Sequence, residues 1–159
     1  MKNKFIKLRT ANVDDYFACL PLLTTLYHGD IGANFQHSFE NFVNHEESII
    51  LLAEHSNKVI GILIGSHHLD IDWEGKIANI DALIVDETFR RMKIGRKLVR
   101  CFVTRARKDH CKVIRSRVNR KNKIAQSFHE AFGFTKANTY EYILDLQGQN
   151  NSQLKTHEN

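Results

Sequence analysis

The sequence predicts an α/β fold, a sandwich in which helices cover both faces of one mixed sheet. Three β-branched and apolar runs, at residues 48–55, 58–68 and 76–86, indicate consecutive, largely buried strands. Stretches with a helical period flank these runs, and a further strand pattern at 111–118 separates two of the helical stretches. With 42% apolar residues among 159, the chain has enough material for a sizeable core, most simply in one domain.

The first part of the chain predicts a strand and then two helices. Residues 5–9 alternate apolar and polar side chains, as a short strand does. Asn12 can cap a helix whose apolar stripe extends to Tyr27. Pro21 interrupts that stripe and lacks an N–H group, so we expect a kink or two shorter helices. Ser38 is expected to begin the second helix.

The remainder alternates strands and helices. The polar residues 56–58 join the first two apolar runs, which predicts a hairpin. A helix is expected to begin at Ile94, and another over 124–132 to end at Gly133, which tolerates a left-handed backbone. Residues 140–146 predict a last strand. The domain should span 1–147, and the polar residues 148–159 bury too little to offset their ordering entropy, so we expect a disordered tail.

Composition restricts the location and the partners of the protein. A formal charge of +5 suits a polyanionic partner, which could be nucleic acid, a membrane surface or a phosphorylated cofactor. The three cysteines include no C-x-x-C pair, so neither a disulfide framework nor a thiolate metal site is indicated. No run approaches the roughly 18 apolar residues that span a bilayer, and the N-terminus has too short an apolar run for a signal peptide. We therefore expect a cytoplasmic protein without a membrane partner.

The stretch from Val85 to Leu98 has the layout of a phosphate site. An apolar strand ends at Val85, a short turn follows, and residues 90–95 lead into a helix. The N–H groups and the dipole of a helix start attract an anion, and the missing side chain of Gly95 lets it approach the backbone. On this motif alone, a basic helix face kept in water explains the charges equally well.

The same stretch resembles the acetyl-CoA loop of the GCN5-related N-acetyltransferase (GNAT) superfamily, whose pattern is Arg/Gln-x-x-Gly-x-Gly/Ala at a helix start. Arg90 and Gly95 match that pattern, and Lys93 stands in place of its first glycine. Residues 122–134, NKIAQSFHEAFGF, resemble the second signature, Asn-x-x-Ala-x-x-Phe-Tyr-Glu-x-x-Gly-Phe, with His129 in place of tyrosine. The resemblance covers about residues 5–146 and implies a GNAT-like α/β/α sandwich with a mixed, mostly antiparallel sheet.

The resemblance also implies an activity. The protein would move acetyl from acetyl-CoA, its co-substrate, to a primary amine of a small molecule by direct attack in a ternary complex. The fourth and fifth strands would splay apart to admit the pantetheine arm, and the pyrophosphate would rest on N–H groups of residues 91–96. The residues implied in cofactor binding are Leu83, Ile84, Val85, Arg90, Arg91, Met92, Lys93, Ile94, Gly95, Arg96, Asn122 and Phe128.

Two side chains are candidates for catalysis by the same resemblance. Family members often use a strand-four carboxylate as general base, and Asp81 holds that place; pairing with a nearby cation is an equally good explanation of it. His129 replaces a tyrosine that commonly protonates the leaving thiolate, a role open to an imidazolium, although an isolated helix histidine is more often structural. Asn122 can contact the cofactor or cap its helix, and Phe128 is most simply core.

Other polar clusters bear on the acceptor. Residues 67–74, HHLDIDWE, match no closed metal site, so we expect no metal; they suit an acidic rim for a cationic amine or a solvated hairpin tip. By resemblance, the loop containing Tyr27, His28, Asp30 and Phe35 borders the acceptor pocket. Polyamines, aminoglycosides, amino-acid derivatives and protein amines stay open as acceptors, and so does the oligomeric state, a homodimer included.

Two rival functions follow from the departures and from the charge. Lys93 and His129 leave open a non-catalytic acyl-CoA-binding relative. A nucleic-acid-binding module would use RRMKIGRKLVR as a basic helix. Because that second rival leaves the signature at 122–134 unexplained, we expect no nucleic-acid partner.

Overall fold

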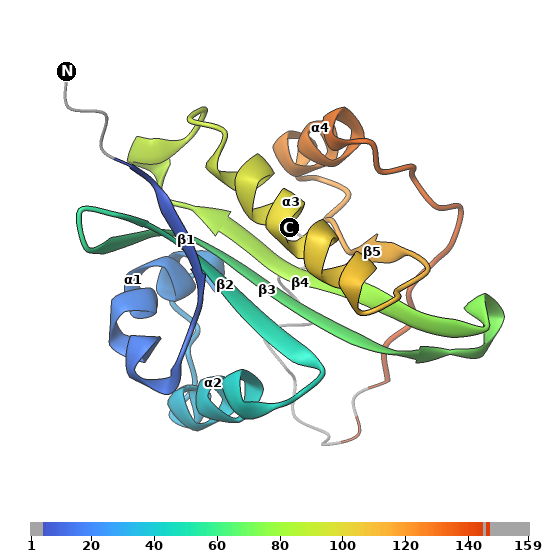
Figure 1. Ribbon diagram of the computed structural model, residues 1–159, viewed down its shortest axis with the longest axis horizontal. Helices are drawn as coiled ribbons and strands as arrows, with labels where there is room; N and C mark the ends of the chain where they lie inside the picture. Colours follow the sequence, from blue (N-terminus) through green and yellow to red (C-terminus); the bar gives the residue numbers. More distant parts are fainter. Residues whose placement is uncertain (1–4, 145, 147–159) are drawn as a thin grey trace. The chain divides into compact units, whose positions relative to one another are not determined.

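The computed structural model describes residues 5–144 and 146 of the chain. These residues form two compact units, one ending at Ser116 and one beginning at Arg117. The first unit is built on a five-stranded sheet of order β1-β2-β3-β4-β5 (Figure 1). Strands β1 to β4 pair antiparallel, and β5 pairs parallel with β4. The predicted mixed, mostly antiparallel sheet is confirmed.

The strands follow the apolar runs of the sequence closely. They are β1 (Lys7–Thr10), β2 (Ser48–His55), β3 (Lys58–Asp70), β4 (Gly75–Val85) and β5 (Ile114–Ser116). The turn between β2 and β3 contains Ser56 and Asn57 at φ 50° and 62°. Two successive left-handed residues produce the tight turn whose twist matches that of paired strands, which confirms the predicted hairpin. A 3₁₀ turn, η2 (Ile71–Trp73), joins β3 to β4.

Helices cover both faces of the sheet, as expected. The helices of this unit are α1 (Tyr16–Leu26) and α2 (Phe35–Asn44) on one face and α3 (Ile94–Lys108) on the other (Figure 1). A 3₁₀ turn, η1 (Val13–Asp15), precedes α1, and Asn12 and Asp15 cap it reciprocally, each side chain bonding the other's backbone N–H. A third such turn, η3 (Glu87–Phe89), lies between β4 and α3.

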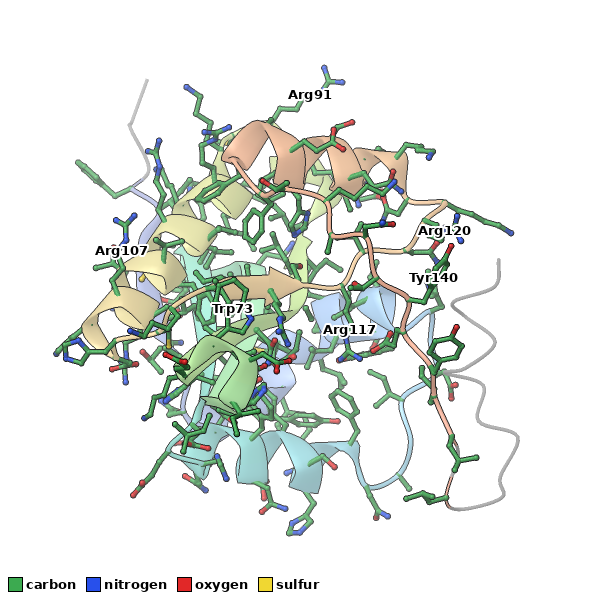
Figure 2. The ribbon with its side chains drawn as sticks, turned by 90° about the vertical axis from the view of Figure 1, so that its right-hand side faces the viewer. Trp73, Arg91, Arg107, Arg117, Arg120 and Tyr140 are labelled. Atoms are coloured by element: carbon green, nitrogen blue, oxygen red, sulfur yellow. The ribbon has the colours of Figure 1, made fainter. Side chains whose placement is uncertain are left out.

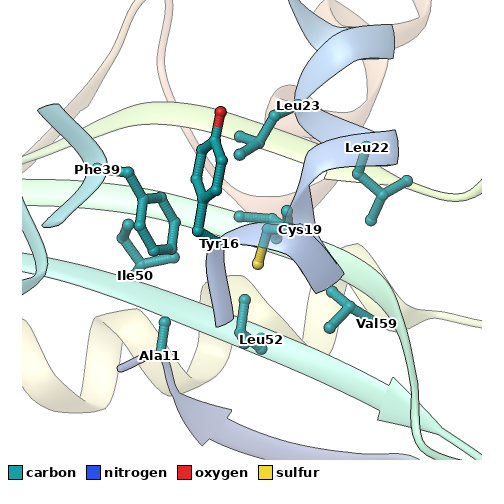
Figure 3. Close-up of a cluster of buried hydrophobic side chains, with 10 residues drawn as sticks. Ala11, Tyr16, Cys19, Leu22, Leu23, Phe39, Ile50, Leu52 and Val59 are labelled. Carbon is teal, nitrogen blue, oxygen red and sulfur yellow. The ribbon is translucent and has the colours of Figure 1, made fainter. Parts of the chain in front are cut away.

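Apolar side chains fill both interfaces between helices and sheet. Under α1 and α2 the core includes Cys19, Leu23, Leu52 and Ile62 (Figure 3). Burial raises the pKa of the Cys19 thiol to about 12, so this cysteine stays protonated and unreactive. On the opposite face the buried side chains of α3 are Ile94, Leu98, Val99, Phe102 and Ala106.

Some predicted boundaries and one predicted strand were wrong. One helix, α1, runs through the exposed Pro21, so the alternative of two shorter helices was wrong. Helix α2 begins at Phe35 rather than Ser38, and β5 covers only part of 111–118. Residues 140–144 and 146 form no strand, and the Tyr142 and Leu144 side chains are 91% and 82% exposed. Alternation predicts a strand, but a strand also needs a hydrogen-bonded neighbour.

The second unit contains one helix, α4 (Lys123–Phe132), within its described residues. Gly133 ends the helix at φ 114°, and its N–H binds the carbonyls of His129 and Glu130, as predicted for a helix-terminating glycine. The tail predicted at 148–159 lies outside the described residues. Among the described helices of both units, none has the length and apolar character needed to cross a membrane.

Candidate functional site

The outer edge of β4 loses its neighbour halfway along the strand. Strand β5 pairs with β4 only at Ala78, Asn79 and Ile80. No other described strand joins that edge over residues 81–85, whereas β3 continues to pair with β4 on the other side as far as Val85. Leu83, Ile84 and Val85 are half-buried along this edge. The pairing therefore leaves a strand edge of the kind that an extended ligand can extend by hydrogen bonding.

Asp81 lies where that gap begins, at a β-bulge. Ile64 is opposite Ala82 and Gly65 is opposite Ile80, so Asp81 is an extra residue of β4 without its own partner in β3. Its carboxylate accepts a 2.8 Å hydrogen bond from the Ser66 hydroxyl. Burial raises the pKa of Tyr27, and the negative charge of Asp81 adds to this effect. The structure thus brings the predicted base together with Ser66 and Tyr27.

The turn after β4 is held by Asp86. One carboxylate oxygen of Asp86 accepts hydrogen bonds from the N–H and the hydroxyl of Thr88, which caps η3. The other accepts a 2.7 Å bond from Lys58 on β3. The Lys58 and Thr88 contacts together lower the pKa of Asp86 to about 2. These contacts fix the point at which the chain leaves the sheet for the loop.

The loop itself takes glycine-like backbone conformations without glycine. Arg91 and Lys93 lie at φ 65° and 63°, in the left-handed region, and Lys93 immediately precedes α3. The first backbone bond of α3 runs from the Lys97 N–H to the Lys93 carbonyl. The N–H groups of Ile94, Gly95 and Arg96 precede that bond and have no carbonyl one turn earlier in the helix. Lys93 therefore keeps the turn that the glycine of the family pattern would make.

Positive charge surrounds this helix start. Arg90 forms an ion pair with Glu87 at 3.0 Å, and both side chains are largely exposed. The Arg91 side chain points away from the loop (Figure 2), and Met92 and Lys93 are exposed. Helix α3 has six cations and no acidic residue. The charge and the helix dipole both favour an anion here.

The second signature forms α4 of the second unit. Asn122 caps the helix, its side chain accepting a 3.0 Å hydrogen bond from the Ala125 N–H, so its predicted capping role is confirmed. His129 is half-buried, and its Nδ1 lies 2.8 Å from the Ala125 carbonyl oxygen. Its ring packs edge-on against Phe128 and Phe134. Asp81 belongs to the first unit, and Asn122, Phe128 and His129 belong to the second.

The acidic residues at the β3–β4 connection differ in whether their carboxylates are exposed and could form the predicted acidic rim for a cationic amine. Asp70 accepts the Asp72 N–H and forms an ion pair with Arg115 at 3.1 Å, so it is engaged in holding η2 and β5. Asp72 and Glu74 are exposed, and Trp73 is 43% exposed at the same tip (Figure 2). Asp72, Trp73 and Glu74 therefore remain exposed, as the predicted acidic rim requires.

Two contributors to the site were missed from the sequence. Ser66 touches Asp81 because of a one-residue bulge, and nothing in a single β-branched run marks the register of its partner. Asp86 anchors the loop through Lys58, which lies 28 residues earlier in the chain. An Asp at a strand end followed by Thr two residues later is a recognisable capping pattern. The contact of Asp86 with Thr88 could therefore have been predicted from the sequence, but its contact with Lys58 could not.

Comparisons with known proteins agree with this architecture. A model of the acetyltransferase (GNAT) family matches residues 13–134. The aminoglycoside N-acetyltransferase AAC(6')-Iy, in complex with CoA, has 16% identity and a TM-score of 0.83 over 91% of this chain and 97% of its own. The 6'-N-acetyltransferase AAC(6')-Ih from Acinetobacter baumannii has 19% identity and a TM-score of 0.79, covering 89% and 98%.

A third solved structure has a different kind of acceptor in its name. The ribosomal-protein-alanine N-acetyltransferase from Brucella melitensis biovar Abortus 2308 has 13% identity and a TM-score of 0.74, covering 89% of this chain and 100% of its own. At such identities the likeness shows a common fold. No curated protein sequence matches the chain significantly.

Proposed function

The chain belongs to the acetyltransferase (GNAT) family, and we propose that it transfers acetyl from acetyl-CoA to a primary amine of a small molecule by direct attack in a ternary complex. One observation carries the proposal. Strand β4 loses its β5 partner after Ile80 and leads into a turn with left-handed residues directly before α3. A strand edge and a helix start thus lie in succession on one short segment.

The two parts of that segment suit the two parts of coenzyme A. Backbone groups of residues 83–85 would hydrogen-bond the pantetheine amides in the manner of an added strand. N–H groups of residues 91–96 would bind the pyrophosphate, with Arg90, Arg91 and Lys93 adding charge. Phe128 and Asn122 of α4 are assigned to the cofactor by family resemblance. Acetyl-CoA supplies the activated acyl thioester.

Asp81 is proposed to act as the base. An amine reaches the site as an ammonium ion and must lose a proton before it can attack. The Asp81 side chain is exposed at the beginning of the gap, so a carboxylate oxygen can take that proton directly or through one water. A neighbouring negative charge also attracts the cationic form of the acceptor.

His129 is proposed to act as the acid for the leaving thiolate, and its contact with Ala125 specifies how. A carbonyl oxygen only accepts hydrogen bonds, so the Nδ1 of His129 must carry a hydrogen at 2.8 Å. In the neutral ring the other nitrogen then has no proton to give. Proton donation from Nε2 consequently requires the imidazolium form, unlike donation from the tyrosine that the family commonly uses.

The similar proteins suggest where to look for the acceptor. AAC(6')-Iy and AAC(6')-Ih are aminoglycoside acetyltransferases, and the Brucella protein is named for a ribosomal-protein alanine. Aminoglycosides and polyamines carry several ammonium groups, which suits an acceptor site beside the negative charge of Asp81. We therefore place small polycationic amines before protein N-termini.

Release of free thiol from acetyl-CoA tests the proposal against a panel of aminoglycosides, polyamines, amino-acid derivatives and an N-terminal peptide. We expect turnover with at least one small amine. Asp81→Asn should lower kcat by about 10²-fold or more while acetyl-CoA still binds. Gly95→Trp should abolish binding by obstructing the helix start. Thermal unfolding of both variants without ligand checks that they fold.

The rivals predict different results in the same experiment. Stabilisation of the wild type by acetyl-CoA without turnover on any amine would favour a non-catalytic acyl-CoA-binding protein. At a ligand concentration of about 100 times Kd, such binding adds roughly 2.7 kcal/mol of stability. Salt-dependent binding of DNA or RNA that Gly95→Trp leaves intact would favour the nucleic-acid-binding module.

A further inference from the structure

The bulge at Asp81 changes the face of the sheet to which its side chain belongs. Ile80, just before it, lies opposite Gly65, whose Cα approaches Phe102 of α3. Ile84, three residues after it, lies opposite Ile62 and packs against the core under α1 and α2. Strict alternation back from Ile84 would send residue 81 to the α3 face. The extra residue instead lets Asp81 share a face with Ser66.

Ser66 and Asp81 meet diagonally across β3 and β4. The register partner of Ser66 is Asn79, two residues before Asp81, and the hydroxyl reaches Oδ2 of Asp81 at 2.8 Å. Ser66 is half-buried in the strand and Asp81 is exposed. The hydroxyl of Ser66 is thus a donor on a paired strand, and its hydrogen bond restricts the rotation of the carboxylate.

Tyr27 is a second group that the charge of Asp81 influences. Tyr27 follows α1 and is half-buried, and its ring packs edge-on against Phe35 with centroids 5.3 Å apart. Burial and the Asp81 charge keep the Tyr27 phenol protonated, so it stays a neutral donor near that charge. The carboxylate thus accepts a hydrogen bond from Ser66 and lies within electrostatic range of the Tyr27 phenol.

We propose that Ser66 is a positioning residue that holds the Asp81 carboxylate in the orientation needed to receive a proton from the acceptor ammonium. The role rests on the proposed function, since it concerns the same base. Ser66 itself contacts no substrate in this role. It donates to one oxygen of the carboxylate and so restricts its rotation, and it favours the ionised form that can act as a base.

Three variants test this role with the acceptor found most active in the thiol-release assay. Ser66→Ala should lower kcat roughly tenfold to a hundredfold, the range for losing a hydrogen bond to a charged group, with the KM for acetyl-CoA unchanged. Ser66→Thr retains a hydroxyl and should restore most of the rate. Ser48→Ala is the matched control, because Ser48 lies directly opposite Ser66 on β2 and should leave kcat as it is.

A double variant and an NMR titration separate positioning from general damage. In an Asp81→Asn background, Ser66→Ala should cause no further loss. The pH midpoint of the Asp81 side-chain carboxyl carbon signal should move upward in Ser66→Ala and stay unchanged in Ser48→Ala. That titration needs no turnover, so it supports or overturns the contact even if no amine is acetylated and the proposed function fails.

Three results would overturn the inference. One is a Ser66→Ala variant with wild-type kcat and an unmoved carbon signal. A second is an equal loss of rate in the presence and absence of the Asp81 carboxylate, which would show that Ser66 acts elsewhere. A loss that Ser66→Thr fails to repair, with the signal unmoved, would likewise assign Ser66 to packing alone.

Discussion

Gly65→Ala should destabilise the protein strongly, because β3 and α3 are in close contact at this residue. A Cβ atom built on Gly65 would lie 2.5 Å and 2.7 Å from two ring carbons of Phe102. It would also lie 2.9 Å from the carbonyl oxygen of Asn79. Phe102 is only 3% exposed, so its ring has little room to turn. The Asn79 oxygen belongs to the backbone of the neighbouring strand, so it cannot move away without disturbing the sheet.

Relief of such contacts by shifts of packed groups costs about 1–3 kcal/mol. The involvement of backbone places Gly65→Ala in the upper part of this range, at about 2–3 kcal/mol. For a chain of this length, a loss of about 2 kcal/mol lowers Tm by roughly 4–8 °C. Urea unfolding followed by circular dichroism gives the free energy directly, and a thermal scan gives Tm.

Two further alanine variants calibrate the measurement. A Cβ on Gly61 would meet methyl groups of Ile94 and Leu98 at 3.0 Å and 3.2 Å and the Ala53 Cβ at an ordinary 3.4 Å, so Gly61→Ala should lose less stability. A Cβ on Gly32 would meet nothing within 4 Å, and this glycine does not have a positive φ, so Gly32→Ala should leave stability equal or slightly higher. Equal stabilities for the Gly65 and Gly32 variants would refute the reasoning about close packing.

Three other substitutions should each lower the stability of the folded protein. Asp86→Asn should cost up to about 1 kcal/mol at neutral pH, since Lys58 is 63% exposed. The pKa of Asp86 is lowered to about 2, so its contribution is complete above the ordinary carboxyl range and is lost as pH falls toward 2; urea unfolding at several pH values should show the variant and wild type converging. Arg9→Met leaves the largely buried Asp15 without its cation and should cost about 2–4 kcal/mol at neutral pH. Because Arg9 lowers the pKa of Asp15, that cost should shrink on acidification, and a pH-independent loss would contradict the assignment. Gly133→Ala, at φ 114°, should lose about 1–2 kcal/mol in thermal unfolding, with Gly133→Asn milder; equal losses would argue against backbone strain.

Much of the fold could be predicted because its signals are local. The hairpin at Ser56 and Asn57, the beginning of α3 at Ile94 and the end of α4 at Gly133 each depend on residues next to one another in the chain. Hydrophobic period and cap chemistry act over a few residues, so one sequence shows them.

The features that were not predicted from the sequence depend on contacts between residues far apart in the chain. The bulge that directs Asp81 toward Ser66 exists only in the register between β3 and β4. The alternating residues 140–144 had the pattern of a strand and found no neighbour to pair with in the described chain. Lys93 departs from a glycine pattern, yet its backbone still takes the left-handed conformation, because the fixed strand end and helix start dictate it.

The presence of Lys93 in place of a glycine has a thermodynamic consequence for ligand binding. A residue with a Cβ atom samples fewer backbone conformations than glycine does. The loop at Arg91 and Lys93 therefore has less conformational freedom than a loop with glycine at these positions. In the proposed complex with acetyl-CoA, the loop would therefore lose less conformational entropy when the pyrophosphate binds, because the strain of its left-handed residues is already present in the folded protein. Compared with a glycine-rich turn, this loop would lower the stability of the fold slightly, but its binding conformation would already be formed before the ligand binds.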